Sequence, residues 1–183
     1  NTRCIVSMDD SHTAAMEYCI TPENYSGKIT VRTELDGTVI NWGVKRYREL
    51  NSKHWKPISQ GTFSGNVGFL VTRTSQSKIE LCEAAKVRVF VGGKRIIPKI
   101  AAQEQRGKLG LQFTLKATEG RTVSIEKTVA VYSSLHDEGD VVEAAAAKIG
   151  RAFRFNTLAK KPSAAWHELW DKFDIEIDGD DFS

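Results

Sequence analysis

Length, composition and charge limit what this chain can be. Its 183 residues are 40% hydrophobic and 27% charged, the balance of a folded globular domain, and no apolar run is long enough to span a bilayer. The formal net charge of +3 is too small to indicate a nucleic acid as the partner. The odd set of three cysteines, Cys4, Cys19 and Cys82, favours a reduced, cytoplasmic location.

The first segment of the chain carries strand patterns. Residues 28–35 alternate between apolar or β-branched and polar side chains, which predicts a half-buried strand. The Asp36-Gly37 dipeptide is typical of a hairpin turn, and residues 38–40 begin the returning strand.

The next segment, residues 41–60, breaks this pattern and combines basic with aromatic side chains. Such a combination presents hydrogen-bond donors beside flat apolar faces, which suits the binding of a sugar. It equally suits a loop that docks on a neighbouring domain or subunit, and both interpretations stay open. The residues predicted for one of these roles are Trp42, Arg46, Tyr47, Arg48, His54 and Trp55.

Strand signals then return and continue to residue 132. The expected strands cover residues 67–73, 78–82, 86–91, 94–100, 109–115 and 122–132. Gly92-Gly93 and Glu119-Gly120 supply turns between consecutive strands. Short strands at this spacing predict a mainly β fold, an antiparallel β-sandwich or a curled antiparallel sheet, over residues 1–136.

The composition changes at Asp137, and residues 137–183 are predicted to form a helical linker. Residues 140–152 are rich in alanine and begin with acidic residues, which favours a helix. A second helix is expected to start at Pro162. Its apolar side chains, spaced i, i+3, i+4 and i+7, form one stripe, for which packing against a partner is a better interpretation than a sugar platform. The stripe consists of Trp166, Leu169, Trp170 and Phe173.

The sequence shows no motif of a self-contained catalytic or metal site. It contains neither Gly-x-Ser-x-Gly nor a phosphate-binding loop that ends in Gly-Lys-Ser or Gly-Lys-Thr. Its four histidines are scattered and no Cys-x-x-Cys occurs, so we expect no metal ligand and no cofactor. Residues 174–179 imitate the start of a calcium-binding loop, but their isoleucines alternate as in a strand. An acid–base pair for sugar isomerisation would have to use His12 with Glu17 or His54 with Glu49.

Six stretches, which follow one another along nearly the whole chain, carry a family resemblance. They are IVSMDDSH (5–12), TPENYSGKITVR (21–32), LDG (35–37), RYREL (46–50), EKTVAVY (126–132) and WHELWDKFD (166–174). Together they resemble the N-terminal region of glycoside hydrolase family sixty-five enzymes, the maltose, trehalose and kojibiose phosphorylases. The resemblance implies a β super-sandwich and a helical linker that leads to an (α/α)6 barrel. It further implies that the start of the sandwich and the whole barrel lie outside these 183 residues.

The resemblance implies that this chain is a non-catalytic part of an inverting phosphorylase of α-linked glucose disaccharides. In that family phosphate is the co-substrate and attacks the anomeric carbon, while a glutamic acid in the barrel protonates the leaving oxygen. No residue of this chain is therefore expected to be catalytic. We expect the chain to shape the mouth of its own catalytic domain and to contribute to the contact of a homodimer.

Two other functions stay open on the sequence alone. One is a free-standing carbohydrate-binding β-sandwich module that uses the aromatic segment 41–60. The other is a small enzyme that resembles the sugar isomerases built on a β-sandwich.

Overall fold

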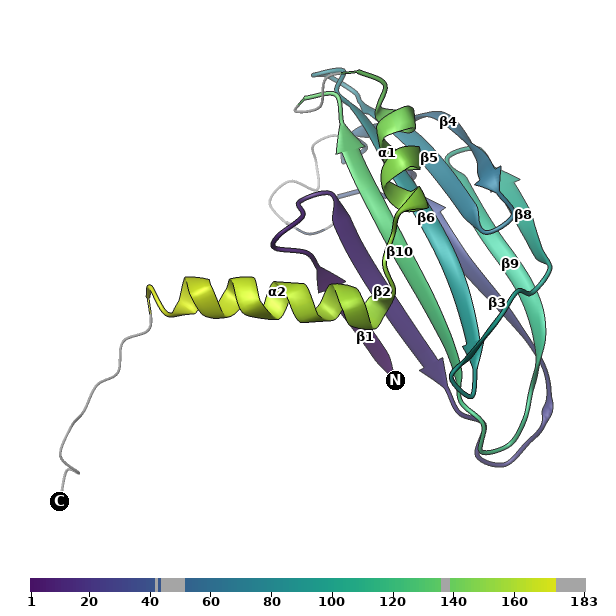
Figure 1. Ribbon diagram of the computed structural model, residues 1–183. Helices are drawn as coiled ribbons and strands as arrows, with labels where there is room; N and C mark the ends of the chain where they lie inside the picture. The colour runs from purple at the N-terminus through teal and green to yellow at the C-terminus, as the bar shows by residue number, and fades with distance from the viewer. Residues whose placement is uncertain (42, 44–51, 136–138, 174–183) are drawn as a thin grey trace, which may run out of the picture.

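Figure 1 shows a computed structural model of the chain, which describes residues 1–41, 43, 52–135 and 139–173. The elements, in chain order, are β1 (Thr2–Val6), β2 (Thr13–Ile20), β3 (Gly27–Asp36), β4 (Trp55–Ser64), β5 (Val67–Thr74), β6 (Glu80–Val91), β7 (Lys94–Ile96), β8 (Ile100–Gln105), β9 (Lys108–Ala117), β10 (Val123–Ser133), α1 (Val141–Gly150) and α2 (Phe155–Trp170). No helix within these described ranges has the length and apolar character needed to cross a membrane.

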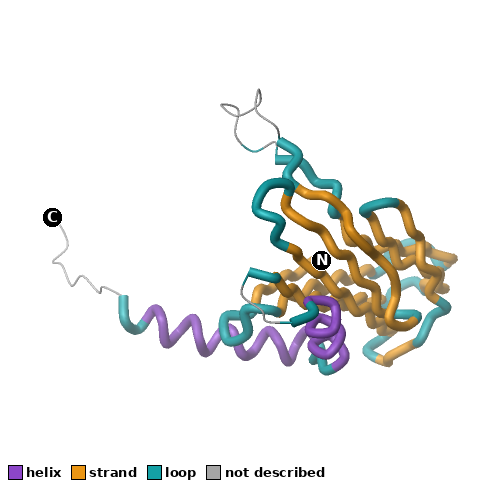
Figure 2. The backbone as a smooth tube through the Cα atoms, turned by 90° about the horizontal axis from the view of Figure 1, so that it is seen from above, coloured by secondary structure: helices purple, strands orange, loops and turns teal. Residues whose placement is uncertain are grey.

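The strands form two antiparallel sheets that pack face to face. The larger sheet has the strand order β1-β2-β10-β6-β5-β4, with β7 paired to β6, and the smaller sheet has the order β3-β9-β8. Helix α1 lies on the outer face of the larger sheet, over β6 and β10, and α2 leaves the body as an arm (Figure 1, Figure 2). The predicted mainly β sandwich, followed by C-terminal helices, is confirmed.

Apolar side chains that alternate along the strands fill the space between the two sheets. On β3 the alternation read from the sequence places Ile29, Val31 and Leu35 against the larger sheet. Burial of such surface stabilises the fold by roughly 25 cal/mol per Å². The buried residues of the main inter-sheet cluster are Val87, Val89, Leu111, Phe113, Leu115, Val123 and Ile125.

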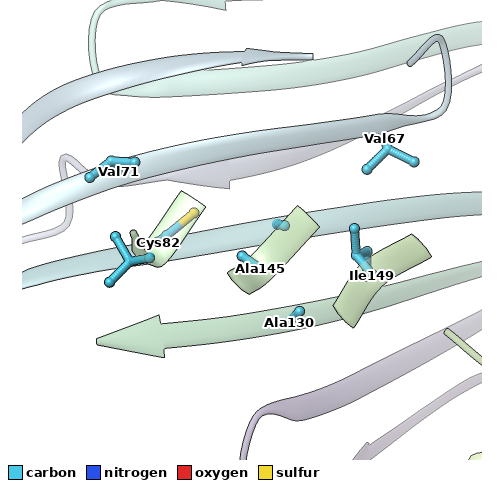
Figure 3. Close-up of a cluster of buried hydrophobic side chains, with 8 residues drawn as sticks. Val67, Val71, Cys82, Ala130, Ala145 and Ile149 are labelled. Atoms are coloured by element: carbon cyan, nitrogen blue, oxygen red, sulfur yellow. The ribbon is translucent and has the colours of Figure 1, made fainter. Parts of the chain in front are cut away.

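A second apolar cluster holds α1 against the outer face of the larger sheet (Figure 3). Cys82 lies in this cluster, and burial raises the pKa of its thiol to about 12, so the group stays protonated at neutral pH. Asp140 caps the start of α1, because its carboxylate accepts hydrogen bonds from the N–H of Val142 at 2.7 Å and of Glu143 at 3.2 Å. The buried members of the cluster are Val67, Val71, Cys82, Ala84, Ala130, Val141, Ala145 and Ile149.

Three parts of the strand prediction differ from the structure. Asp36-Gly37 forms a turn, but residues 38–40 are not a strand, because β3 pairs with β9 and not with a strand that returns directly after the turn. The strands expected at residues 78–82 and 86–91 are one strand, β6, because Ala84 and Ala85 are buried on its opposite faces and β6 pairs on both sides through this stretch. The strand expected at residues 94–100 is divided, since β7 stays on the larger sheet while β8 begins in the smaller one.

The start of α2 also differs from the prediction. The helix begins at Phe155, and Pro162 lies inside it although proline lacks the N–H for one main-chain hydrogen bond. The carboxylate of Glu126 on β10 accepts a hydrogen bond from the N–H of Phe155 at 3.3 Å, and it also binds the Arg154 guanidinium at 3.2 Å. Glu126, which is distant in sequence, therefore fixes where the helix begins. No local pattern around Phe155 predicts this start.

Thr128 is a buried polar residue whose hydroxyl oxygen has no hydrogen-bond partner among the described residues. It lies on β10 and is 1% exposed. A buried unpaired hydroxyl costs free energy, whereas valine has the same shape and favours strands. We expect Thr128→Val to raise the free energy of unfolding by about 1 kcal/mol in urea denaturation, and the exposed Thr62→Val to change it by less than about 0.5 kcal/mol. Equal or lower stability of Thr128→Val would contradict this assignment.

Glu83 gives the fold a dependence on pH. It lies on the face of β6 that turns to the smaller sheet, and burial raises the pKa of its carboxyl above the usual 4.5 although the Lys127 charge acts in the opposite direction. The folded state therefore holds the Glu83 proton more tightly than the unfolded state does. The stability that protonated Glu83 contributes is complete below pH 4.5 and is lost as the pH rises through the raised pKa of the folded state. We expect Glu83→Gln to unfold at the same urea concentration as the wild type at pH 4 and at a higher one at pH 8. If Glu83→Gln and the wild type also unfold at the same urea concentration at pH 8, this expectation is refuted.

Candidate functional site

The structure describes two of the six residues predicted from segment 41–60. Trp42, Arg46, Tyr47 and Arg48 lie outside the described residues. Trp55 begins β4 and is half-buried, and it pairs with Thr74 on β5. The side chain of His54 is exposed, and its carbonyl oxygen accepts hydrogen bonds from the N–H of Ser75 at 2.8 Å and from the Ser75 hydroxyl at 3.0 Å.

Trp55 lines a cavity of about 780 Å³, which we call the Trp55 groove. Four segments that are distant in the sequence meet there: the end of β3, the start of β4, the end of β5 and the turn between β8 and β9. The described residues that line the groove are Gly37, Thr38, Lys53, Trp55, Lys56, Pro57, Ile58, Ser75 and Arg106.

Hydrogen bonds across the two sheets hold the wall that carries Arg106. The Gln60 side chain donates to the carbonyl oxygens of Gln105 at 2.8 Å and Lys108 at 3.0 Å, and its amide oxygen accepts from the N–H of Gly107 at 2.8 Å. Gly107 adopts φ +79°, and a Cβ at this position would lie 2.5 Å from Pro57 Cγ. Only glycine fits this position without strain. Because Gly107 has no side chain, the turn beside Arg106 can lie directly against Pro57 of β4.

The charges that line the groove have one sign. Lys53, Lys56 and Arg106 contribute three cations, and no carboxylate is among the described lining residues. Asp36 lies near Thr38, and burial acts to raise its pKa, but hydrogen bonds from Lys108 at 2.6 Å and from Thr38 outweigh burial and lower it. Asp36 is therefore ionised at neutral pH and already bound to its own partners.

Sequence reasoning missed Lys53, Lys56 and Arg106 as parts of this site. Arg106 stands in an Arg-Gly turn between two strands, and that turn signal could have been noted. Its position beside Trp55 follows from long-range sheet packing, which no local pattern encodes.

The described residues do not bring the proposed isomerase pair together. The His12 ring stacks on Tyr132 at 4.0 Å between ring centroids, and its Nδ1 lies 2.8 Å from the carbonyl oxygen of Val131. Glu17 lies farther along β2, at the end of about 13 Å of extended strand, where it accepts hydrogen bonds from Arg3. Glu49, the partner suggested for His54, lies outside the described residues. Within the described ranges, no group of three metal-binding side chains is close enough to hold an ion.

A second feature of the molecule is the apolar stripe on α2. Trp166 is 43% exposed, Trp170 60% and Phe173 69%, and Leu169 is partly buried. The first turns of α2 pack on β1 and β2 through Phe155 and Leu158, which are buried beside Ala15. The rest of the helix projects away from the sandwich (Figure 1, Figure 2). Trp166, Leu169 and Trp170 of the predicted stripe thus lie on the arm, and Phe173 lies in the turn that follows it.

Comparison with known proteins places the chain in a family. The profile described as "Glycosyl hydrolase family 65, N-terminal domain" matches residues 1–169. The chain belongs to glycosyl hydrolase family 65. The family resemblance read from the six sequence stretches is therefore confirmed.

Relatives in family 65 include disaccharide phosphorylases. The chain is 32% identical over 187 residues to kojibiose phosphorylase of Halothermothrix orenii, which covers 97% of this chain and 23% of that protein. It is 27% identical over 183 residues to α,α-trehalose phosphorylase of Thermoanaerobacter brockii, with 96% of this chain and 23% of that protein covered. The chain thus spans about a quarter of the length of these relatives.

A solved structure supports the same fold. The structure of a putative kojibiose phosphorylase from the human microbiome superposes with a TM-score of 0.74 at 15% sequence identity, over 91% of this chain and 21% of that one. At this identity the likeness concerns the fold alone. The chain is therefore a family 65 N-terminal domain with the corresponding β architecture.

Proposed function

We propose that this chain is the non-catalytic N-terminal domain of an inverting phosphorylase of α-linked glucose disaccharides, and that α2 docks the catalytic domain of the same protein. The apolar stripe of α2 is the observation that carries the proposal. Its two tryptophans are exposed on a helix that extends away from the sandwich, and Phe173 is exposed in the turn that follows the end of this helix at Trp170. Large apolar side chains gathered on one helix face normally pack against a partner.

The remainder of the same protein is the occupant that best fits this stripe. The phosphorylases that match this chain are about four times as long as the matched region. A helix that follows the sandwich, anchored at its start and apolar near its end, can carry the chain from one domain onto the next. In this proposal residues 1–136 form the sandwich and residues 137–183 form the linker.

The proposal assigns positioning roles and no catalytic residue to this chain. The general acid belongs to the catalytic domain, inorganic phosphate is the co-substrate, and an α-linked glucose disaccharide is the substrate. The sandwich shapes the mouth of the catalytic domain and contributes to the contact of a homodimer in the cytoplasm. The three cysteines, none of which forms a disulfide in the structure, support the cytoplasmic location.

Phosphorolysis measured on two proteins tests the proposal. The product of the full reading frame and the 183-residue chain are each supplied with phosphate and kojibiose, trehalose, maltose or nigerose, and released glucose 1-phosphate is measured. We expect phosphorolysis of at least one disaccharide by the long protein and none by the chain. Phosphorolysis by the chain alone, or hydrolysis without phosphate by the long protein, would overturn the proposal.

A further inference from the structure

We propose that Lys86 and Arg88 of β6 are positioning residues for the phosphorolysis proposed above, because they hold the connection between α1 and α2, residues 151–154, against the sandwich. These two residues, which we call the β6 clamp, set the direction in which α2 leaves the sandwich and thereby the placement of the catalytic domain. The inference rests on the function proposed for α2. It concerns the alignment of two domains and assigns no contact with the substrate.

The clamp consists of two cationic side chains on the outer face of the larger sheet. Lys86 and Arg88 are two residues apart on one strand, so both side chains point to the face that carries α1. The ammonium group of Lys86 donates to the carbonyl oxygens of Ile149 at 3.4 Å and Gly150 at 3.2 Å. Carbonyl groups at the end of a helix lack partners within the helix, and a cation there also offsets the helix dipole. Lys86 therefore fixes the end of α1 on the sheet.

Arg88 holds the residues that lie beyond the end of α1. Its guanidinium donates to the carbonyl oxygens of Ala152 and, at 3.0 Å, of Phe153. Hydrogen bonds from a charged donor are stronger than those between neutral groups. The next residue, Arg154, binds Glu126 on β10 at 3.2 Å, and Glu126 pairs in register with Arg88. Three consecutive residues before α2 are thus bound to the same region of the larger sheet.

The direction of α2 depends on how its start is held. Phe155 and Leu158 in its first turns are buried beside Ala15, and the helix then projects away from the sheet (Figure 1, Figure 2). At about 1.5 Å per residue its 16 residues extend roughly 24 Å, so a change of about 10° at its start moves its far end by about 4 Å. A misplacement of about 1 Å in an active site can lower a rate about 100-fold. A small error at the connection therefore becomes a large error where the catalytic domain docks.

Distances between two spin labels test the clamp in the 183-residue chain. The labels are attached at Lys116→Cys on β9 and Glu168→Cys on α2, both of which are exposed positions. The background carries Cys4→Ser and Cys19→Ser and keeps the buried Cys82. Pulsed electron paramagnetic resonance reports the distribution of distances between the sandwich and the helix. We expect a narrow distribution while the clamp is intact.

Substitutions in the clamp are expected to broaden this distribution. Arg88→Met keeps an aliphatic stem but removes every donor, so it should broaden the distribution at least about twofold, and Lys86→Met should broaden it less. Arg88→Lys keeps the charge and should restore part of the narrow distribution. Arg95→Met is the matched control, because Arg95 is an exposed cation on the neighbouring β7 that donates no hydrogen bond to the connection among the described residues. An unchanged distribution in Arg88→Met, or equal broadening in Arg95→Met, would overturn the clamp.

Kinetics of the long protein test the positioning role. We expect Arg88→Met to raise the KM for the disaccharide at least about tenfold, because the sandwich then no longer shapes the mouth of the catalytic domain, and to change the KM for phosphate less than about twofold. Unchanged KM values, with or without a lower kcat, would reduce the clamp to a structural role and overturn the proposal. If the unsubstituted long protein phosphorolyses no disaccharide, the proposed function fails, and the distances in the chain alone still decide for or against the clamp.

Discussion

Replacing Glu126 with alanine is expected to lower the free energy of unfolding by about 2 to 3 kcal/mol and to release α2 from the sandwich. The Glu126 side chain is 1% exposed and accepts hydrogen bonds from the Arg154 guanidinium at 3.3 and 3.2 Å and from the N–H of Phe155 at 3.3 Å. Arg154 also lies over the Phe90 ring at 4.0 Å. The substitution removes the partner that fixes the first turn of α2 and leaves a cavity beneath it.

Urea denaturation measures the loss of stability, and limited proteolysis between residues 150 and 156 measures the release of α2. Glu126→Gln keeps the shape but not the charge and is expected to lose less stability than alanine. Glu104→Ala, at an exposed site on β8, is the control and should change the stability by less than about 0.5 kcal/mol. A Glu126→Ala protein as stable and as resistant to protease as the wild type would contradict this account of the helix start.

Replacing Trp166 and Trp170 together with serine is expected to lower phosphorolysis by the long protein at least about tenfold. In the 183-residue chain the same double substitution should change the free energy of unfolding by less than about 0.5 kcal/mol, because both side chains are largely exposed there. If the stripe docks the catalytic domain, serine removes the apolar contact that positions it, and each lost indole costs roughly 3 kcal/mol or more of packing.

Initial rates with saturating phosphate measure the effect, and size-exclusion chromatography shows whether the long protein keeps its assembly. Lys160→Ser changes an exposed polar residue on the same helix and serves as the control, with unchanged rates expected. Full activity in the double tryptophan variant would show that the stripe does not dock a catalytic domain. Loss of stability in the isolated chain would instead mean that the tryptophans pack within it.

The fold could be predicted where one local pattern determined an element. The alternation over residues 28–35 gives β3, and the alanine-rich, Asp-capped segment gives α1 within one or two residues of its predicted bounds. The prediction was wrong where a partner distant in sequence decides the outcome. β6 runs unbroken through Ala84 and Ala85 because β5 and β10 flank it, and α2 starts at Phe155 because Glu126 binds there.

The same distinction applies to the candidate site. Trp55 and His54 were singled out because aromatic and basic residues cluster locally in the sequence. Arg106 and Thr38 could not be placed beside Trp55, since the contact depends on the packing of one sheet on the other and on the Gln60 hydrogen bonds. The apolar stripe of α2 is helical in period and could be read directly, but a helical period does not show which surface covers it.

Hydrogen–deuterium exchange along α2 tests the central claim most directly. The exchange of residues 155–170 is compared, by mass spectrometry of matching peptides, between the 183-residue chain and the product of the full reading frame. If α2 docks the catalytic domain, its amides in the second half of the helix should exchange at least about tenfold more slowly in the long protein than in the chain. Equal exchange in the two proteins would contradict the assignment of this helix as the docking linker.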